Sequence, residues 1–133
     1  MTTANFDGGA RGNPGPAGWG VVIRGDDGTV LAELHGALGR ATNNVAEYHG
    51  LLAALQWAAD HGVTSLLVRG DSLLLIEQMR GNYRVKHEGL QPLYRQARLL
   101  VARIGDVRFE HVARERNTDA DRLSNLGMDA NPA

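Results

Sequence analysis

The order of strand-like and helix-like segments restricts the fold of this chain more than any other feature. Residues 18–38, GWGVVIRGDDGTVLAELHGAL, hold two apolar, β-branched runs joined at residues 26–28. An Asp-Gly step between such runs is a strong hairpin signal. An earlier strand is predicted to end near Phe6 and Asp7. We therefore expect the chain to begin with three antiparallel strands.

Helical spacing replaces strand alternation between Asn43 and His61, where Leu51, Leu55 and Ala58 share one stripe. The next segment, SLLVRGD, is an almost wholly apolar strand, which suits a sheet covered on both faces. Helices are predicted over residues 72–79 and 90–104, a strand over 107–113, and a last helix over 117–128. This order predicts an α/β fold with helices on both faces of a mixed sheet.

Composition narrows the class of protein. With 133 residues, 43% of them hydrophobic, the chain is predicted to form a single domain over residues 1–133. There is no cysteine, which excludes disulfides and thiolate zinc sites. No apolar stretch is long enough for a membrane span, and Asp7 and Arg11 interrupt any signal peptide. We expect a cytoplasmic, monomeric protein with no membrane partner.

The charge is unevenly distributed, although the formal net charge is only -1. Between Arg80 and Arg103 there are six basic residues and one acidic residue, Glu88. Such a surplus can attract a polyanion. A solvated helix face explains one charged run equally well.

Four acidic residues lie at predicted element boundaries: Asp7, Glu47, Asp71 and Asp121. Each has an ordinary explanation by itself, such as a turn residue for Asp7, a capping box with Asn44 for Glu47, or a helix cap for Asp71. Asn117 or Thr118 is a plausible cap for the last helix, which leaves Asp121 on its inward side.

Taken together, the four acids favour a shared site. Open α/β sheets bind ligands at the carboxyl ends of their strands, where Asp7 and Asp71 are expected. Converging carboxylates would repel one another unless cations neutralised them. Magnesium binds through a few carboxylates plus substrate phosphate, so the cluster points to metal-assisted phosphoryl chemistry.

The glycine-rich stretch from Phe6 to Gly20, FDGGARGNPGPAGWG, does not match a nucleotide-binding loop. A P-loop needs Gly-Lys-Ser/Thr and a dinucleotide loop needs Gly-x-Gly-x-x-Gly, each opening a helix. A strand follows these glycines instead. We interpret the stretch as a turn that carries Asp7 and permits close backbone approach at Gly8, Gly9 and Gly12.

Four segments together, DGGARGNPG, RATNNVAEYHGLLAAL, RGDSLLLIEQM and RERNTDADRLSN, resemble the type 1 ribonuclease H family from about Phe6 to Met128. The resemblance implies a ribonuclease H-like α/β fold with a five-stranded mixed sheet. It also implies hydrolysis of the RNA strand of an RNA–DNA hybrid, leaving 5′-phosphate and 3′-hydroxyl ends. The metal ligands and catalytic acids would be Asp7, Glu47, Asp71 and Asp121.

The family's chemistry implies two Mg²⁺ ions, or Mn²⁺ in their place. Such ions lie ~3.5–4 Å apart, one activating the attacking water and the other stabilising the leaving oxygen. By the same resemblance, the substrate is read through its 2′-hydroxyls and phosphates. The implied substrate-binding residues are Gly12, Asn13, Arg40, Thr42, Asn43, Asn44 and Asn117.

Three features depart from many relatives. The usual loop histidine before the last acid, which assists product release in those relatives, is absent, and Arg114 or Arg116 is nearby instead. Arg114 is expected to assist catalysis by serving the departing phosphate. Leu73 replaces a polar groove contact, and NYRVKHEGL is shorter and less basic than the handle of some members. Hybrid affinity should therefore be modest and fall with salt, and other RNA-containing duplexes could be substrates.

Other functions remain open from the sequence. One is a different nuclease or transposase-like member of the same superfamily, although it would lack the Gly-Asn-Pro-Gly and Thr-Asn-Asn segments. A second is a hybrid- or duplex-binding module with weak or no catalysis, which would gain nothing from acids facing phosphates. A third is a glycosidase with paired acids, whose activity would survive EDTA.

Overall fold

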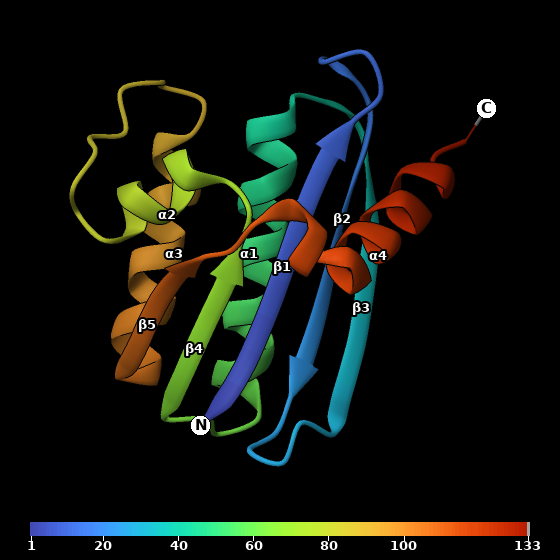
Figure 1. Cartoon of the computed structure of the whole chain (residues 1–133). Helices are drawn as coiled ribbons and strands as arrows, with labels where there is room; N and C mark the ends of the chain where they lie inside the picture. Colours follow the sequence, from blue (N-terminus) through green and yellow to red (C-terminus); the bar gives the residue numbers. More distant parts are fainter. Residues whose placement is uncertain (133) are drawn as a thin grey trace.

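The computed structural model describes residues 1–132, which form one five-stranded sheet and its covering helices (Figure 1). The sheet order is β3-β2-β1-β4-β5. In chain order the elements are β1 (Thr2–Ala10), β2 (Gly15–Arg24), β3 (Val30–Ala41), α1 (Asn43–Asp60), β4 (Ser65–Gly70), α2 (Leu73–Met79), α3 (Gln91–Ile104), β5 (Asp106–His111), the 3₁₀ turn η1 (Arg114–Arg116) and α4 (Thr118–Asp129).

The first three strands form the predicted antiparallel meander. β1 pairs with β2, and β2 pairs with β3. The β2–β3 connection turns at the predicted residues: Thr29 N–H donates to the Asp27 carboxylate, and Gly28 has a φ of 82°. A positive φ favours glycine because it has no Cβ to clash with the backbone. Local turn chemistry therefore set this hairpin as expected.

β4 and β5 add to the sheet in parallel, beside β1. Parallel neighbours need long crossovers, and α1 and then α2 with α3 supply them. The helix starts are capped by hydroxyls: Thr42 Oγ1 accepts from Val45 N–H, and Ser72 Oγ accepts from Leu75 N–H. The ordinary explanations of Glu47 as part of a capping box with Asn44, and of Asp71 as a helix cap, therefore do not hold.

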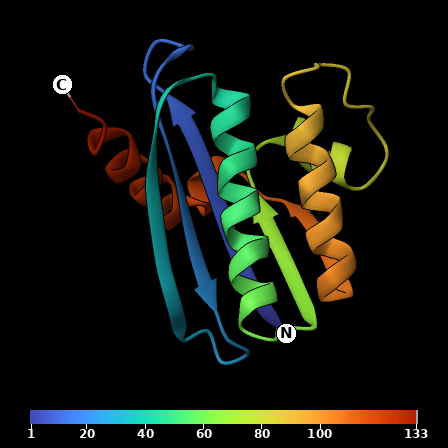
Figure 2. The same ribbon diagram turned by 180° about the vertical axis from the view of Figure 1, so that it is seen from behind.

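Helices cover both faces of the sheet, as predicted. α1 and α3 lie on one face (Figure 2), and α4 crosses the other face over β1, β2 and β3 (Figure 1). The predicted stripe of Leu51, Leu55 and Ala58 is fully buried in the core. Because α4 does not reach β4, alternate residues of that strand, such as Leu67, are only half-buried. The expectation that β4 is covered on both faces is therefore only half correct.

The glycine-rich segment is mostly strand rather than loop. β1 continues three residues beyond Asp7, which pairs with Gly20 of β2, and only residues 11–14 form the turn. The earlier end predicted for this strand is wrong because Gly8 and Gly9 accept strand geometry while contributing no apolar signal. Within residues 1–132, no helix combines the length and the apolar character that a membrane crossing requires.

Candidate active site

One cavity of about 380 Å³ is lined by all four predicted acids. Asp7 comes from the middle of β1, Glu47 from the second turn of α1, Asp71 directly follows β4, and Asp121 lies in the first turn of α4. The chain thus brings together side chains from four elements beside the middle of β1 and the carboxyl end of β4. The roles expected for these acids remain predictions.

Close backbone contacts allow the two helices to bring their acids so near to β1. A Cβ on Gly8 would lie 2.3 Å from the Ala46 carbonyl carbon and 2.5 Å from Glu47 N. A Cβ on Gly20 would lie 2.5 Å from both Leu123 Cβ and Ser124 N of α4. Glycine is needed at both positions for steric reasons, and close approach at Gly8 was expected.

The approaches predicted at the other two glycines are not found. A Cβ on Gly9 would make only ordinary contact, 3.5 Å from Met128 Cε, and Gly12 instead supplies a turn with a φ of 79°.

Burial and mutual repulsion make ionisation unfavourable in the cavity. Burial raises the pKa of Asp7 from 3.8 to about 8, and the charges of Asp71 and Asp121 add to this rise. A hydrogen bond of 2.9 Å from Gly8 N–H opposes it. Burial likewise raises the pKa of Glu47 from 4.5 to about 7, aided by Asp71 and opposed by a hydrogen bond from Ser72. A bound cation would relieve both costs.

The buried side chain of Asn117 fixes the orientation of the Asp71 carboxylate. Its amide donates to Asp71 Oδ2 at 3.2 Å and to Phe6 O at 2.9 Å, and its oxygen accepts from Asn5 at 3.1 Å. Asn117 is only 1% exposed. These amide contacts are to protein groups, and the substrate contact expected for Asn117 remains a prediction. Its side chain does not cap α4, although it occupies the N-cap position.

The side chains of the cavity suit a hard divalent cation, because the negatively charged atoms that could bind a metal are all carboxylate oxygens. No three acidic or histidine side chains within residues 1–132 are arranged so that they could hold an ion by themselves. Magnesium does not need a complete protein cage, since it commonly binds one or two carboxylates plus substrate phosphate. The residues present therefore fit a metal site completed by substrate.

Asn43 is the substrate-contact candidate that lines the same cavity as the acids. Its Oδ1 accepts from Ala10 N–H at 2.7 Å, and its own N–H donates to Asn13 Oδ1 at 3.0 Å. These two bonds join the start of α1 to the β1–β2 turn. They hold Asn43 in the lining of the acidic cavity and Asn13 in the lining of a neighbouring one.

The other candidates lie beside the acidic cavity rather than in it. Asn13, Thr42 and Asn44 line a neighbouring cavity of about 220 Å³ together with His87. Arg40, near the end of β3, is exposed. These residues form a polar surface next to the acids, as a long substrate would require, and their substrate roles remain predictions.

Of the two arginines proposed in place of a histidine, Arg114 lines the acidic cavity. Arg116 lines a separate crevice of about 100 Å³ near Asn5 and Arg24. His111 is exposed at the end of β5, with Nε2 3.3 Å from Asp71 O.

Three further polar residues of the cavity, missed in the sequence analysis, are Arg11, Ser124 and Asn125. Helical spacing could have found the last two, because they follow Asp121 by three and four residues.

Comparisons with known proteins show which sequences this chain resembles. A family model described as reverse transcriptase-like matches residues 5–127. A bifunctional protein of Mycobacterium tuberculosis is 54% identical over 125 residues, covering 93% of this chain and 34% of that protein. Ribonuclease HI of Halobacterium salinarum is 44% identical over 126 residues, covering 95% of this chain and 63% of that protein. The chain thus spans about a third of the length of its mycobacterial relatives.

Solved structures of similar proteins have the same fold. The N-terminal RNase H domain of the M. tuberculosis protein superposes with a TM-score of 0.94 at 52% identity, covering 97% of this chain and 94% of that one. RNase H1 of H. salinarum gives 0.93 at 42% identity, covering 98% of each chain. LC11-RNase H1, solved in complex with an RNA/DNA hybrid, gives 0.92 at 40% identity, covering 97% of each chain.

Proposed function

This chain belongs to the type 1 ribonuclease H family, and we propose that it is an endoribonuclease that hydrolyses the RNA strand of RNA–DNA hybrids. We further propose that residues 1–133 are one catalytic domain that acts as a monomer. The single observation that carries the proposal is the cavity in which Asp7, Glu47, Asp71 and Asp121 meet. A protein that only bound nucleic acid would lose affinity by facing phosphates with four carboxylates.

In this proposal the four acids hold two divalent ions, Mg²⁺ or Mn²⁺. Bound ions would supply an activated water and charge stabilisation at the leaving 3′-oxygen, which leaves 5′-phosphate and 3′-hydroxyl ends. The raised pKa values of Asp7 and Glu47 express the repulsion that bound cations would remove. Asn117 acts through Asp71, because its amide fixes one carboxylate oxygen and leaves the other free.

Substrate recognition is assigned to the polar surface beside the acids. Asn13, Asn43 and Asn44 carry amides that can reach the 2′-hydroxyls of an RNA strand in a shallow minor groove. Thr42 and the exposed Arg40 are suited to a phosphate of the other strand. Leu73, which is 50% exposed, offers no polar contact to the groove. Selection against other RNA-containing duplexes should therefore be incomplete.

Incubation of an end-labelled RNA–DNA hybrid with the protein, with and without Mg²⁺, tests the proposal. Double-stranded RNA and DNA serve as substrate controls. Asp71→Asn should remove cleavage while leaving the circular dichroism spectrum unchanged. The matched variant is Asp119→Asn, which removes a charge from the same turn of α4 as Asp121 but lies outside the acidic cavity, paired with Arg24. It should cleave at nearly the wild-type rate.

Three outcomes would count against the proposal. Cleavage that survives EDTA would exclude the metal role of the acids. Near wild-type cleavage by Asp71→Asn would remove Asp71 from the catalytic site. Hybrid binding without cleavage, in every metal tried, would favour a binding module instead.

A further inference from the structure

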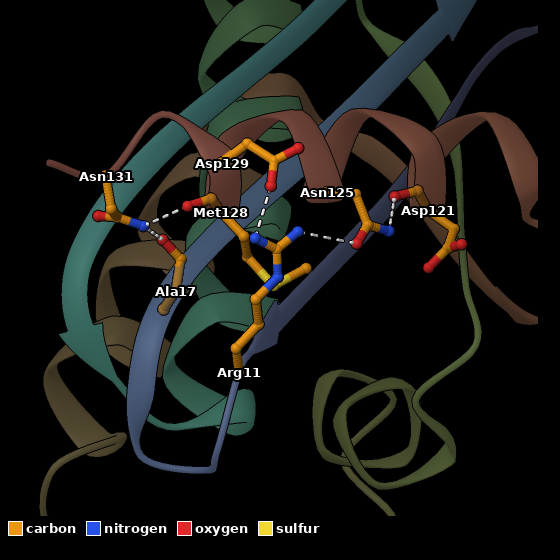
Figure 3. Close-up of polar contacts among 7 residues, drawn as sticks. All are labelled: Arg11, Ala17, Asp121, Asn125, Met128, Asp129 and Asn131. Carbon is orange, nitrogen blue, oxygen red and sulfur yellow. Dashed lines mark hydrogen bonds and ion pairs between the residues drawn. The ribbon is translucent and has the colours of Figure 1, made fainter. Parts of the chain in front are cut away.

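Arg11 places a guanidinium in the lining of the acidic cavity. It opens the β1–β2 turn and reaches across to the last turns of α4, between Asn125 and Asp129 (Figure 3). Nη1 lies 2.5 Å from Asp129 Oδ1, and Nη2 donates to Asn125 Oδ1 at 3.5 Å. The side chains of Arg11 and Asp129 are 50% and 59% exposed. An ion pair this exposed adds little stability.

Other contacts already fix the end of α4 against the sheet. Asn131 Nδ2 donates to Ala17 O at 2.8 Å and to Met128 O at 2.9 Å (Figure 3). Its Oδ1 accepts from Gly39 N–H at 2.7 Å. A Cβ on Gly18 would lie 2.3 Å from Met128 N, so helix and strand are in direct contact there. The position of α4 therefore does not depend on Arg11.

The guanidinium keeps donors free for a ligand. A guanidinium has five N–H groups, and these contacts of Arg11 engage only two of its nitrogens, Nη1 and Nη2. Arg11 and Arg114 are the cationic side chains among the residues that line the acidic cavity. A nucleic-acid strand that enters this cavity brings its phosphates close to four carboxylates. A cation at the rim therefore contributes more to binding than a cation on the open surface.

The position along α4 indicates which phosphate Arg11 can reach. Asn125 and Asp129 follow Asp121 by four and eight residues, or about 6 and 12 Å along the helix axis. One nucleic-acid strand has one phosphate per roughly 3.4 Å of duplex axis. For a strand that runs along α4, this separation corresponds to roughly two to four nucleotides from the position of cleavage, so Arg11 does not act on the scissile phosphate itself.

We propose that Arg11 binds a backbone phosphate of the strand being cut, a few nucleotides from the cleavage position, and that Asp129 competes with that phosphate for the guanidinium. The inference rests on the proposed function, because it requires a nucleic-acid strand in the acidic cavity. Arg11 is then a substrate-positioning residue that raises affinity, and Asp129 is a restraint that lowers it.

Steady-state cleavage of a labelled hybrid and its salt dependence test this assignment. Arg11→Ala should raise KM about 3- to 5-fold with kcat nearly unchanged. It should also lower the slope of log KM against log salt by about 1, as expected when one phosphate contact is lost. Arg11→Lys keeps the charge and should restore most of that slope. Asp129→Ala should lower KM about twofold, and this gain should shrink in the Arg11→Ala background.

Arg122→Ala is the matched control. Arg122 lies on α4 and pairs with Glu33 at 2.6 Å, with side chains 52% and 45% exposed, but it does not line the acidic cavity. This variant loses the same charge and a similar bridge between α4 and the sheet, and it should change KM much less than Arg11→Ala. Equal effects of the two variants would show that Arg11 acts only through the overall charge of the protein and not through a specific phosphate contact, which would overturn the inference.

Two further results would also overturn it. One is a parallel loss of activity in Arg11→Ala and Asp129→Ala, which would make the pair a purely structural bridge. The other is an unchanged KM and salt slope in Arg11→Ala, which would refute the phosphate contact while leaving the nuclease proposal intact. A wild-type chain that neither binds nor cleaves the hybrid would refute the proposed function, and the role of Arg11 with it.

Discussion

Asp7→Asn should stabilise this protein at alkaline pH when divalent ions are absent. Asp7 is 8% exposed, and burial together with the charge of Asp71 raises its pKa from 3.8 to about 8. Asparagine has nearly the same shape and can still accept the hydrogen bond from Gly8 N–H. The substitution therefore removes a buried charge and leaves the local packing in place.

The direction of the pH dependence follows from the raised pKa. The unfolded chain releases the Asp7 proton near pH 3.8, whereas the folded protein keeps it until about pH 8. The contribution of this carboxyl to stability is therefore fully present below pH 3.8 and is lost as the pH rises through about 8. Glu47 acts in the same direction between pH 4.5 and about 7.

The size of the effect can be bounded. A pKa difference of about four, at about 1.4 kcal/mol for each unit, gives an upper limit of roughly 6 kcal/mol. Water and salt in the open cavity reduce the repulsion, so we expect about half of this, roughly 3 kcal/mol. For a domain of this size that corresponds to about 10 °C in Tm. The gain should be near zero at pH 4 and level off above pH 8.

Thermal unfolding followed by circular dichroism from pH 4 to pH 9 in EDTA measures this difference. Asp119→Asn, an exposed acid of α4, is the control and should follow the wild-type curve. Mg²⁺ at pH 8 should raise the Tm of the wild type more than that of Asp7→Asn. The reasoning would be refuted by a gain that is the same at pH 4 and pH 9.

Three further variants test other parts of the site. Arg114→Ala should slow turnover more than it weakens hybrid binding, and equal losses would argue against a role in product release. Asn117→Ala should destabilise the protein by about 3 kcal/mol, because it leaves its buried partners Asn5 and Phe6 O unpaired; urea denaturation measures this loss. It should also weaken activation by Mg²⁺, because Asp71 loses its hydrogen bond, and a metal titration measures that effect. Gly20→Ala should cost about 1–3 kcal/mol, since its Cβ would collide with Leu123, and an unchanged urea midpoint would show that α4 can move away.

The fold was predictable because local patterns carry it. The helical stripe of Leu51, Leu55 and Ala58, the turn at residues 26–28 and the alternation of later strands and helices all appear in the structure as expected. These features depend on residues within a few positions of one another. The four acids could also be identified from the sequence as candidates for the site, because each lies at a predicted element boundary and within one of the four recognisable segments.

The sequence alone did not reveal contacts between segments far apart in the chain. Asn117 was expected at the substrate, yet it is buried against Phe6 and Asp71, more than forty residues away from either. Arg11 was noted only as a charge that interrupts the N-terminus, although it pairs with Asp129 beside the cavity.

The close packing of α4 on the sheet was likewise decided by tertiary structure. Gly18 and Gly20 have no side chains, so the backbone of α4 can approach β2 closely there. Periodicity and turn chemistry specify which element forms, but the distance between two elements depends on side-chain volume at their contact. That volume is set by residues that the chain brings together only on folding.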